Sequence, residues 1–327
     1  MRHLLRRIGF YLVALWAAIT VDFFIPRLAP GNPAELLLAR FQGKLDPQAL
    51  HSLEIAFGIS HEPLWVQYFQ YLNQLAHGDL GTSITYFPTP VVTVIGQELP
   101  WTLVLATVSV VISFVLGTLL GVVVAWRRGS ALDTVLPPLL TFFSAIPYFW
   151  LALILLYVLG FTFNLFPING GYDISVTVGP TLDFLASAIQ HAILPALTLV
   201  LSSIAGWVLG MRNAMVTTLS EEYVLMAEAK GLPERQVMFS YAARNAILPN
   251  VTGFALALGF VVAGQLVTEL VFSYPGIGFS LLQAVSNSDY ALLQGIFLVI
   301  SIAVLLANFL ADLLYAALDP RVRQERG

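Results

Sequence analysis

Long apolar runs alternate with shorter polar segments along the whole chain. Six runs are long enough to cross a bilayer, because a membrane-spanning helix needs roughly 20 mostly apolar residues. They cover residues 8–25, 100–126, 135–160, 192–211, 251–272 and 291–318. The pattern therefore predicts an all-α polytopic membrane protein with six transmembrane helices. The first run has basic flanking residues but is longer than the apolar part of a typical signal peptide, so we interpret it as a retained helix.

The polar stretch between the first two runs, residues 27–99, predicts a small helical region outside the membrane. Asp46-Pro47 and residues 61–63 are typical of helix starts, with proline in the first turn. Apolar and aromatic side chains follow at helical spacing and beyond it, at Leu64, Trp65, Tyr68, Phe69, Tyr71, Leu72, Leu75, Tyr86 and Phe87. Two interpretations stay open: a small core packed on the outer ends of the membrane helices, or a surface that touches a binding protein or stacks on a sugar.

The basic residues predict the orientation of the chain, because Lys and Arg collect on the cytoplasmic side of a membrane protein. Twelve of the fifteen lie at the two termini, after the second run, and between the fourth and fifth runs. The other three, Arg27, Arg40 and Lys44, lie in the long 27–99 region, where this rule is weak. Both termini and the loop at residues 213–250 are therefore predicted to be cytoplasmic.

Composition agrees with a membrane protein and excludes several functions. The chain is 58% hydrophobic and 10% charged, whereas soluble domains carry roughly 25% charged residues. Without Cys it has neither disulfides nor thiolate metal sites. It lacks a G-x-x-x-x-G-K-[ST] phosphate loop, so we predict no nucleotide binding and no enzymatic activity of its own. Four acidic residues fall near the ends of the runs, where we expect them at the membrane interface rather than in a proton relay: Asp22, Asp133, Glu269 and Asp312.

The charged segment between the fourth and fifth runs has the pattern of two short helices joined by a tight bend. Ser220 is suited to cap the first helix, and Gly231 to the left-handed position that ends it. Pro233 fits the first turn of the second helix, with Glu234 beside it. This shape favours docking into a partner protein, not catalysis.

Pro147 lies within the third run. A proline inside a helix removes a hydrogen bond and kinks the helix. A hinge for gating and a fixed bend are both compatible with the sequence.

Several further motifs occur in order along the chain: LAPGNPAE after the first run, HGDLGTS (His77–Ser83), WRRGSALD (Trp126–Asp133), HAILPALTL (His191–Leu199), VFSYPGIG (Val271–Gly278) and LLYAALDPRVR (Leu313–Arg323). Together they resemble the membrane permeases of binding-protein-dependent ABC importers. They are similar to the oligopeptide/dipeptide/nickel branch, and to its first-permease (B-type) subunit.

The resemblance implies a type I ABC importer fold. Residues 1–26 would then form the N-terminus and first helix, 27–99 an extracytoplasmic region, 100–318 the permease core with a cytoplasmic coupling loop at 213–250, and 319–327 a cytoplasmic tail. The family's EAA motif, a coupling helix that contacts the ATPase, matches Tyr223, Ala227, Glu228, Ala229, Lys230, Gly231 and Leu232. Glu228 stands where the branch often has Arg, and Tyr241 where it often has His.

The same resemblance implies a permease subunit of an ATP-driven peptide importer, located in a prokaryotic inner membrane. Its implied partners are a second homologous permease, two ATPase subunits that hold ATP and magnesium, and an extracytoplasmic solute-binding protein. This chain itself would hold no cofactor. An oligosaccharide or nickel importer of the same family, and a non-transporting scaffold or sensor subunit, stay open as alternatives.

The predicted topology can be tested by cysteine labelling, since every introduced cysteine is the only one in the chain. Gly231→Cys should react with a membrane-impermeant maleimide only after the membrane is opened. His77→Cys, in the region predicted to lie outside, should react in intact cells. Labelling of position 231 in intact cells would contradict the topology.

Overall fold

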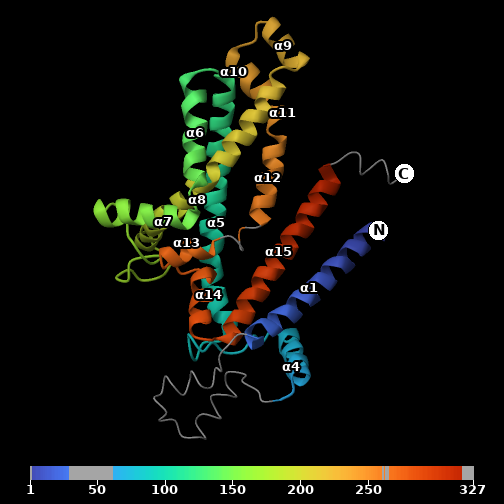
Figure 1. Cartoon of the computed structure of the whole chain (residues 1–327), viewed down its shortest axis with the longest axis vertical. Helices are drawn as coiled ribbons and strands as arrows, with labels where there is room; N and C mark the ends of the chain where they lie inside the picture. Colours follow the sequence, from blue (N-terminus) through green and yellow to red (C-terminus); the bar gives the residue numbers. More distant parts are fainter. Residues whose placement is uncertain (1, 29–61, 260, 262–264, 319–327) are drawn as a thin grey trace. The chain divides into compact units, whose positions relative to one another are not determined.

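The computed structural model describes residues 2–28, 62–259, 261 and 265–318, and most of these residues are helical (Figure 1). No strand occurs within these ranges, only an isolated bridge between Thr82 and Pro90. The chain divides into two compact units. One comprises Met1–Thr102, Val262–Leu266 and Pro275–Gly327, and the other Leu103–Val261 and Val267–Tyr274. The all-helical membrane fold predicted from the sequence is confirmed.

Four helices and the beginning of a fifth build the first unit. They are α1 (Arg2–Leu28), α4 (Leu64–Ala76), the first part of α5 (Val91–Trp126), α14 (Ile277–Ser286) and α15 (Tyr290–Leu318). α15 packs against both α1 and α14. The expected helix start near residues 61–63 is confirmed, because α4 begins directly after Pro63. The expected start at Asp46-Pro47 lies outside the described residues.

A buried carboxylate holds the loop between α4 and α5. Asp289, which is fully buried, accepts hydrogen bonds from Ser83 Oγ at 2.5 Å and from the Thr85 backbone N–H at 2.9 Å. It also caps α15, since its other oxygen accepts from the Leu292 N–H at 3.1 Å. Two segments more than two hundred residues apart in sequence are thereby fixed to each other.

The second unit contains the remainder of α5 and the helices that follow it. These are α6 (Ala131–Ala145), α7 (Tyr148–Leu155), η1 (Leu156–Thr162), α8 (Leu182–Thr218), α9 (Glu222–Ala229), α10 (Glu234–Gln236), η2 (Val237–Ala243), α11 (Arg244–Ala246), α12 (Leu248–Gly259) and, from Val267 onward, α13 (Leu266–Val271). η1 and η2 are π-helical. α6 packs along α8, and α7 contacts the same helix (Figure 1).

Four of the predicted spans are single long apolar helices, the first, second, fourth and sixth. The third predicted span is divided into two helices, because α6 and the α7–η1 helix meet at an angle of 98°. Ile146, the residue before Pro147, has an extended backbone with φ −70° and ψ 127°, the conformation that a following proline favours. Pro147 therefore precedes α7 and does not lie inside a helix. A hinge at this position stays a prediction.

The fifth predicted span also differs from a single helix. In the described residues it consists of α12, which has 12 residues, and α13, which has 6. Neither is long enough to cross a bilayer alone. The chain thus has four helices long and apolar enough to span a membrane within its described part, or five if the bent pair is one span.

Two glycines let α5 and α8 approach closely. A Cβ on Gly117 would lie 2.5 Å from Trp207 Cβ, and one on Gly121 would lie 2.7 Å from both Met211 Cβ and the Val208 carbonyl oxygen. Small residues spaced by four are a common way for membrane helices to bring their backbones together. The pair is further connected by a hydrogen bond of 2.9 Å between Ser203 Oγ and Ser113 Oγ.

The close approach predicts a difference between two otherwise equivalent substitutions. Gly121→Ala and Gly206→Ala both improve helix propensity by about 1 kcal/mol, but Gly206 has open space around its Cβ position. We expect Gly121→Ala to be less stable than Gly206→Ala by roughly 1–3 kcal/mol, because overpacking displaces the α8 backbone. Thermal unfolding of the two purified variants in detergent measures this. Equal unfolding temperatures would show that the helices are not in tight contact here.

Candidate coupling surface

The bend at Gly231 ends α9 with a Schellman motif. Gly231 has a φ of 71°, a left-handed conformation in which a side chain is disfavoured. Its N–H donates to the Glu228 carbonyl at 2.9 Å, and the Leu232 N–H donates to the Ala227 carbonyl at 3.4 Å. This pair of bonds defines the motif. The sequence-based prediction of a glycine bend is confirmed, and the bend separates α9 from α10.

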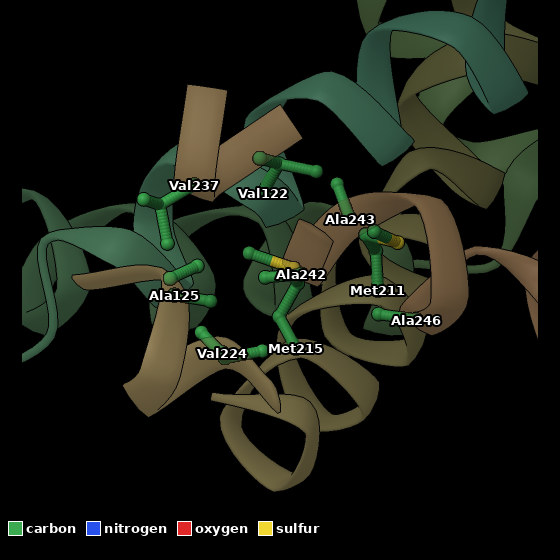
Figure 2. Packing of buried hydrophobic residues seen from close by; sticks show 10 residues of the cluster. Val122, Ala125, Met211, Met215, Val224, Val237, Ala242, Ala243 and Ala246 are labelled. Atoms are coloured by element: carbon green, nitrogen blue, oxygen red, sulfur yellow. The ribbon is translucent and has the colours of Figure 1, made fainter. Parts of the chain in front are cut away.

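An apolar cluster fixes this segment to the ends of α5 and α8 (Figure 2). α9 contributes two side chains on one face, Val224 and Ala227, which are buried almost completely. The other buried members come from α5, α8 and the helices after the bend: Val122, Ala125, Met211, Met215, Val237, Ala242, Ala243 and Ala246. Leu232, just after the bend, packs against the same cluster. The helix before the bend and the residues after it are therefore packed against the same apolar cluster.

The opposite face of α9 and the bend are exposed. Leu225 and Met226 have exposed fractions of 52% and 58%, and Tyr223 of 39%. The polar residues at the bend, Glu228 and Lys230, are exposed as well. An apolar patch ringed by charges is typical of a protein interaction surface. We call these residues, Tyr223, Leu225, Met226, Glu228, Ala229, Lys230 and Gly231, the coupling surface.

Three details of the sequence interpretation change. Ser220 does not cap α9: the N-cap is Glu221, and the Ser220 hydroxyl instead donates to the Thr217 carbonyl at 2.7 Å. Pro233 is the N-cap of α10 rather than its first helical residue. Ala227, predicted with the ATPase-contacting residues, lies in the apolar cluster with an exposed fraction of 3%, so in this structure it positions α9 and does not face outward.

Two side-chain hydrogen bonds connect α9 and α10 to other helices. The Asn245 amide donates to Tyr223 Oη at 2.8 Å, which joins α11 to α9. The Trp126 indole N–H donates to the Glu234 carboxylate, which joins the end of α5 to α10. The role of Trp126 was not predicted from the sequence, because a tryptophan at the end of an apolar run usually indicates only the membrane interface.

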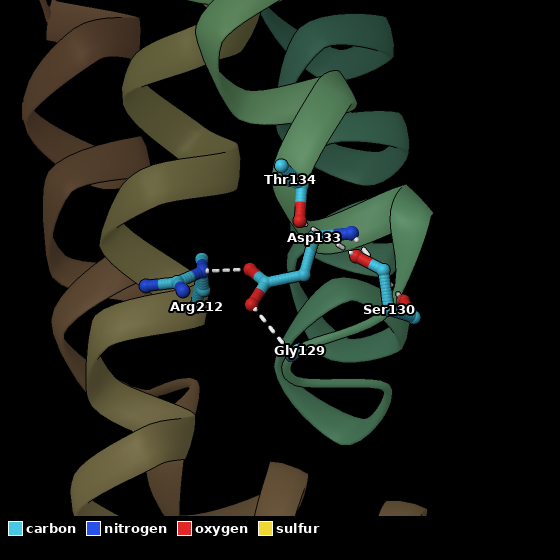
Figure 3. Close-up of polar contacts among 5 residues, drawn as sticks. All are labelled: Gly129, Ser130, Asp133, Thr134 and Arg212. Carbon is cyan, nitrogen blue, oxygen red and sulfur yellow. Dashed lines mark hydrogen bonds and ion pairs between the residues drawn. The ribbon is translucent and has the colours of Figure 1, made fainter.

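An ion pair fixes the start of α6 near the same ends of the helices (Figure 3). Arg212 Nε of α8 lies 2.6 Å from Asp133 Oδ1, and Asp133 Oδ2 accepts from the Gly129 N–H at 3.0 Å. Ser130 caps α6 by accepting from the Asp133 N–H. The WRRGSALD motif is thus a helix–turn–helix connection whose acidic residue holds α8.

A groove lies beside the coupling surface, along the helices that follow the bend. It encloses about 610 Å³ and is lined by Leu119, Pro233, Arg235, Gln236, Phe239 and Ser240. Its walls combine apolar side chains with one guanidinium and two neutral polar groups.

The acidic residues near the helix ends have different surroundings from each other. Asp22 and Glu269 are buried in the protein, with exposed fractions of 5% and 0%, and Asp133 forms the ion pair with Arg212. The expected position of these residues at the membrane interface stays a prediction. The side chain of Asp312 lies outside the described residues. Among the side chains that are described, no three His, Asp or Glu groups converge to hold a metal ion.

Comparison with known proteins identifies the family. Residues 117–324 match the inner membrane component of binding-protein-dependent transport systems. The chain belongs to this family. The matched range of the permease contains α6, α8, the coupling surface and its apolar cluster.

Similarity to individual relatives extends over the whole permease. It is 32% identical to the dipeptide transport system permease protein of Lactococcus lactis subsp. cremoris, over 98% of this chain and 99% of the relative. It is 33% identical to the di/tripeptide transport system permease protein of Pseudomonas aeruginosa, over 98% of each chain. The oligopeptide transport system permease protein of Bacillus subtilis is also 33% identical, over 98% of each chain. The resemblance to the peptide branch of ABC importer permeases is confirmed.

The apolar cluster predicts that a charge inside it releases the segment. Val224→Asp would bury an unpaired carboxylate, which costs several kcal/mol. We expect trypsin to cleave the detergent-solubilised permease at Lys230 and Arg235 severalfold faster in this variant. Leu225→Asp introduces the same charge at the exposed neighbouring position and should leave cleavage unchanged. Equal cleavage in the two variants would mean that the cluster does not hold α9.

Proposed function

We propose that this permease is a membrane subunit of an ATP-driven importer of di- and oligopeptides. The names of its relatives support a peptide substrate, since three of them at 32–33% identity are dipeptide, di/tripeptide and oligopeptide permeases. The absence of a phosphate loop in the sequence supports a separate source of energy. ATP and magnesium would then belong to the partner ATPases.

The proposed assembly contains this permease, a second homologous permease, two ATPase subunits and an extracytoplasmic solute-binding protein. The two permeases would each form half of the translocation path. The distribution of Lys and Arg supports a multi-pass arrangement in a prokaryotic inner membrane with both termini cytoplasmic. Residues 27–99 would face outward, residues 100–318 would form the core, and residues 213–250 the cytoplasmic loop.

The coupling surface is the proposed contact with an ATPase. The observation that carries this proposal is the glycine-capped bend at Gly231, presented outward while Val224 and Ala227 hold its base on α5 and α8. A segment fixed this way transmits force to the helices beneath it, whereas a flexible loop would absorb it. ATP shifts the equilibrium between inward- and outward-open states only through its different affinity for the two, and the segment would carry that difference into the membrane.

The bend predicts how substitutions at position 231 affect coupling. A valine there is disfavoured by about 1 kcal/mol or more, because β-branched residues resist positive φ. We expect Gly231→Val to insert into the membrane normally, to co-purify poorly with the ATPase and to lose binding-protein-stimulated ATP hydrolysis in proteoliposomes. Gly231→Asn should retain most of the activity, since asparagine tolerates the left-handed conformation.

The matched control is Gly78→Val, which places the same side chain at a φ of 74° with open space around it, in the other unit. It should co-purify with the ATPase as the wild type does. Normal assembly and transport by Gly231→Val would refute the assigned role of the bend. A loss of function in Gly231→Asn equal to that in Gly231→Val would show that backbone conformation is not the cause.

A further inference from the structure

α4 is an amphipathic helix without any charged residue. Its 13 residues, LWVQYFQYLNQLA, contain no Asp, Glu, Lys or Arg. Its polar residues are Gln67, Gln70, Asn73 and Gln74, and they gather on one side of the helix. The other residues of α4 are apolar or aromatic. They form a wider surface than a single neighbouring helix can cover.

Part of the apolar surface contacts α1. The Tyr68 ring packs edge-on against Phe23 at 5.2 Å, and its hydroxyl is 2.7 Å from Thr20 Oγ1. The Tyr71 ring lies 5.6 Å from the same Phe23. The Arg27 guanidinium bonds Gln67 at 3.1 Å. Figure 1 shows α4 beside the C-terminal end of α1. For Tyr68 and Tyr71 these contacts agree with the first of the two interpretations, because both rings pack on the end of α1.

A second apolar surface on α4 stays exposed. Trp65 and Phe69 are four residues apart and so lie on one face of the helix, with exposed fractions of 67% and 64%. No residue of α4 is fully buried. Two large aromatic rings in water are unfavourable, because burying one contributes roughly 1.5–3 kcal/mol.

The surroundings of α4 indicate what covers these rings. α1 is long and apolar enough to span a membrane, and two of its side chains near the same end, Phe24 and Leu28, are apolar and exposed, as a surface that faces lipid would be. Arg27 lies at this end too, with its guanidinium 3.7 Å above the Phe23 ring and bonded to the Phe23 carbonyl. Arginines at the ends of membrane helices place their charge at the headgroup level. Through Gln67, α4 is fixed at that level.

We propose that α4 is an interfacial helix, whose Trp65 and Phe69 insert into the boundary between headgroups and acyl chains of the bilayer. The partner is phospholipid, and the lipid-facing surface of α1 continues onto α4. Tryptophan is enriched at this depth because its ring is apolar while its N–H reaches water. The lack of charge in α4 fits insertion beside neutral and anionic headgroups alike. Lipid, in addition to α1, would thus hold the start of the outer region.

Spin labelling of single cysteines tests the proposal in the full-length permease reconstituted into phosphatidylcholine–phosphatidylglycerol vesicles. Labels would be placed at Trp65→Cys and Phe69→Cys. The control is Gln74→Cys, nine residues from Trp65 and hence on the opposite side of a helix with 3.6 residues per turn. Collision rates with oxygen, which concentrates in lipid, and with a water-soluble nickel chelate report the surroundings of each label.

We expect the ratio of oxygen to nickel collisions to be severalfold higher at positions 65 and 69 than at position 74. Two results would overturn the proposal. Equal access of the nickel chelate to all three labels would place the aromatic face in water. Exclusion of both reagents from 65 and 69 would mean that protein covers the face: another part of this chain, a second copy or a binding protein. Using two labelled positions ensures that a local disturbance at one does not decide the outcome.

Discussion

Apolar packing between α9 and the ends of α5 and α8 holds the whole coupling surface in place. α9 has only 8 residues, and isolated helices shorter than about 12–15 residues are marginal in water. Its stability therefore comes from Val224 and Ala227 in the cluster and from the Schellman cap at Gly231. Fully burying one valine contributes roughly 1.5–3 kcal/mol. The same contacts that form the helix also decide which of its faces is presented outward.

The cluster itself depends on how closely α5 and α8 approach. Met211 and Met215 of α8 reach Val122 and Ala125 of α5 in the cluster, next to the place where Gly121 lets the two backbones meet. Asn250 connects α12 to α5 and α8, since its amide donates to Thr118 Oγ1 at 3.2 Å and to the Trp207 carbonyl at 3.1 Å. The close contact between α5 and α8 and the packing of α9 on their ends thus form one continuous region.

Much of this arrangement could be predicted from the sequence, where one physical signal dominates. Length and hydropathy predicted α1, α5, α8 and α15, and the need for positive φ predicted the bend at Gly231. The predictions failed where local effects compete. The extended backbone before Pro147 turns one apolar run into two helices at 98°, and hydropathy alone contains no such information. Similarly, Ser220 has the chemistry of a cap, but its hydroxyl bonds backward to Thr217.

The candidate site was predicted as a segment but not as a surface. The sequence pattern indicated two helices and a bend, and the resemblance to ABC importer permeases named its residues. Which of them face outward depends on contacts distant in sequence, such as those of Ala227 with α5 and α8. The bond from Trp126 to Glu234, 108 residues away, has the same origin. No local pattern signals a pairing of this kind.

The length of α8, which contributes Met211 and Met215 to the cluster, has a mechanical consequence. Between Pro195 and Thr218 no proline interrupts α8, and this stretch is about 35 Å long at a rise of 1.5 Å per residue. The ion pair with Asp133 and the cluster both hold α8 near one end, and α6 and α7 pack against the same helix. In the proposed coupling, a force applied at this end would therefore tilt α8 together with α6 and α7. A tilt of about 8° would move the far end by about 5 Å, which is roughly the spacing of neighbouring strands in a sheet.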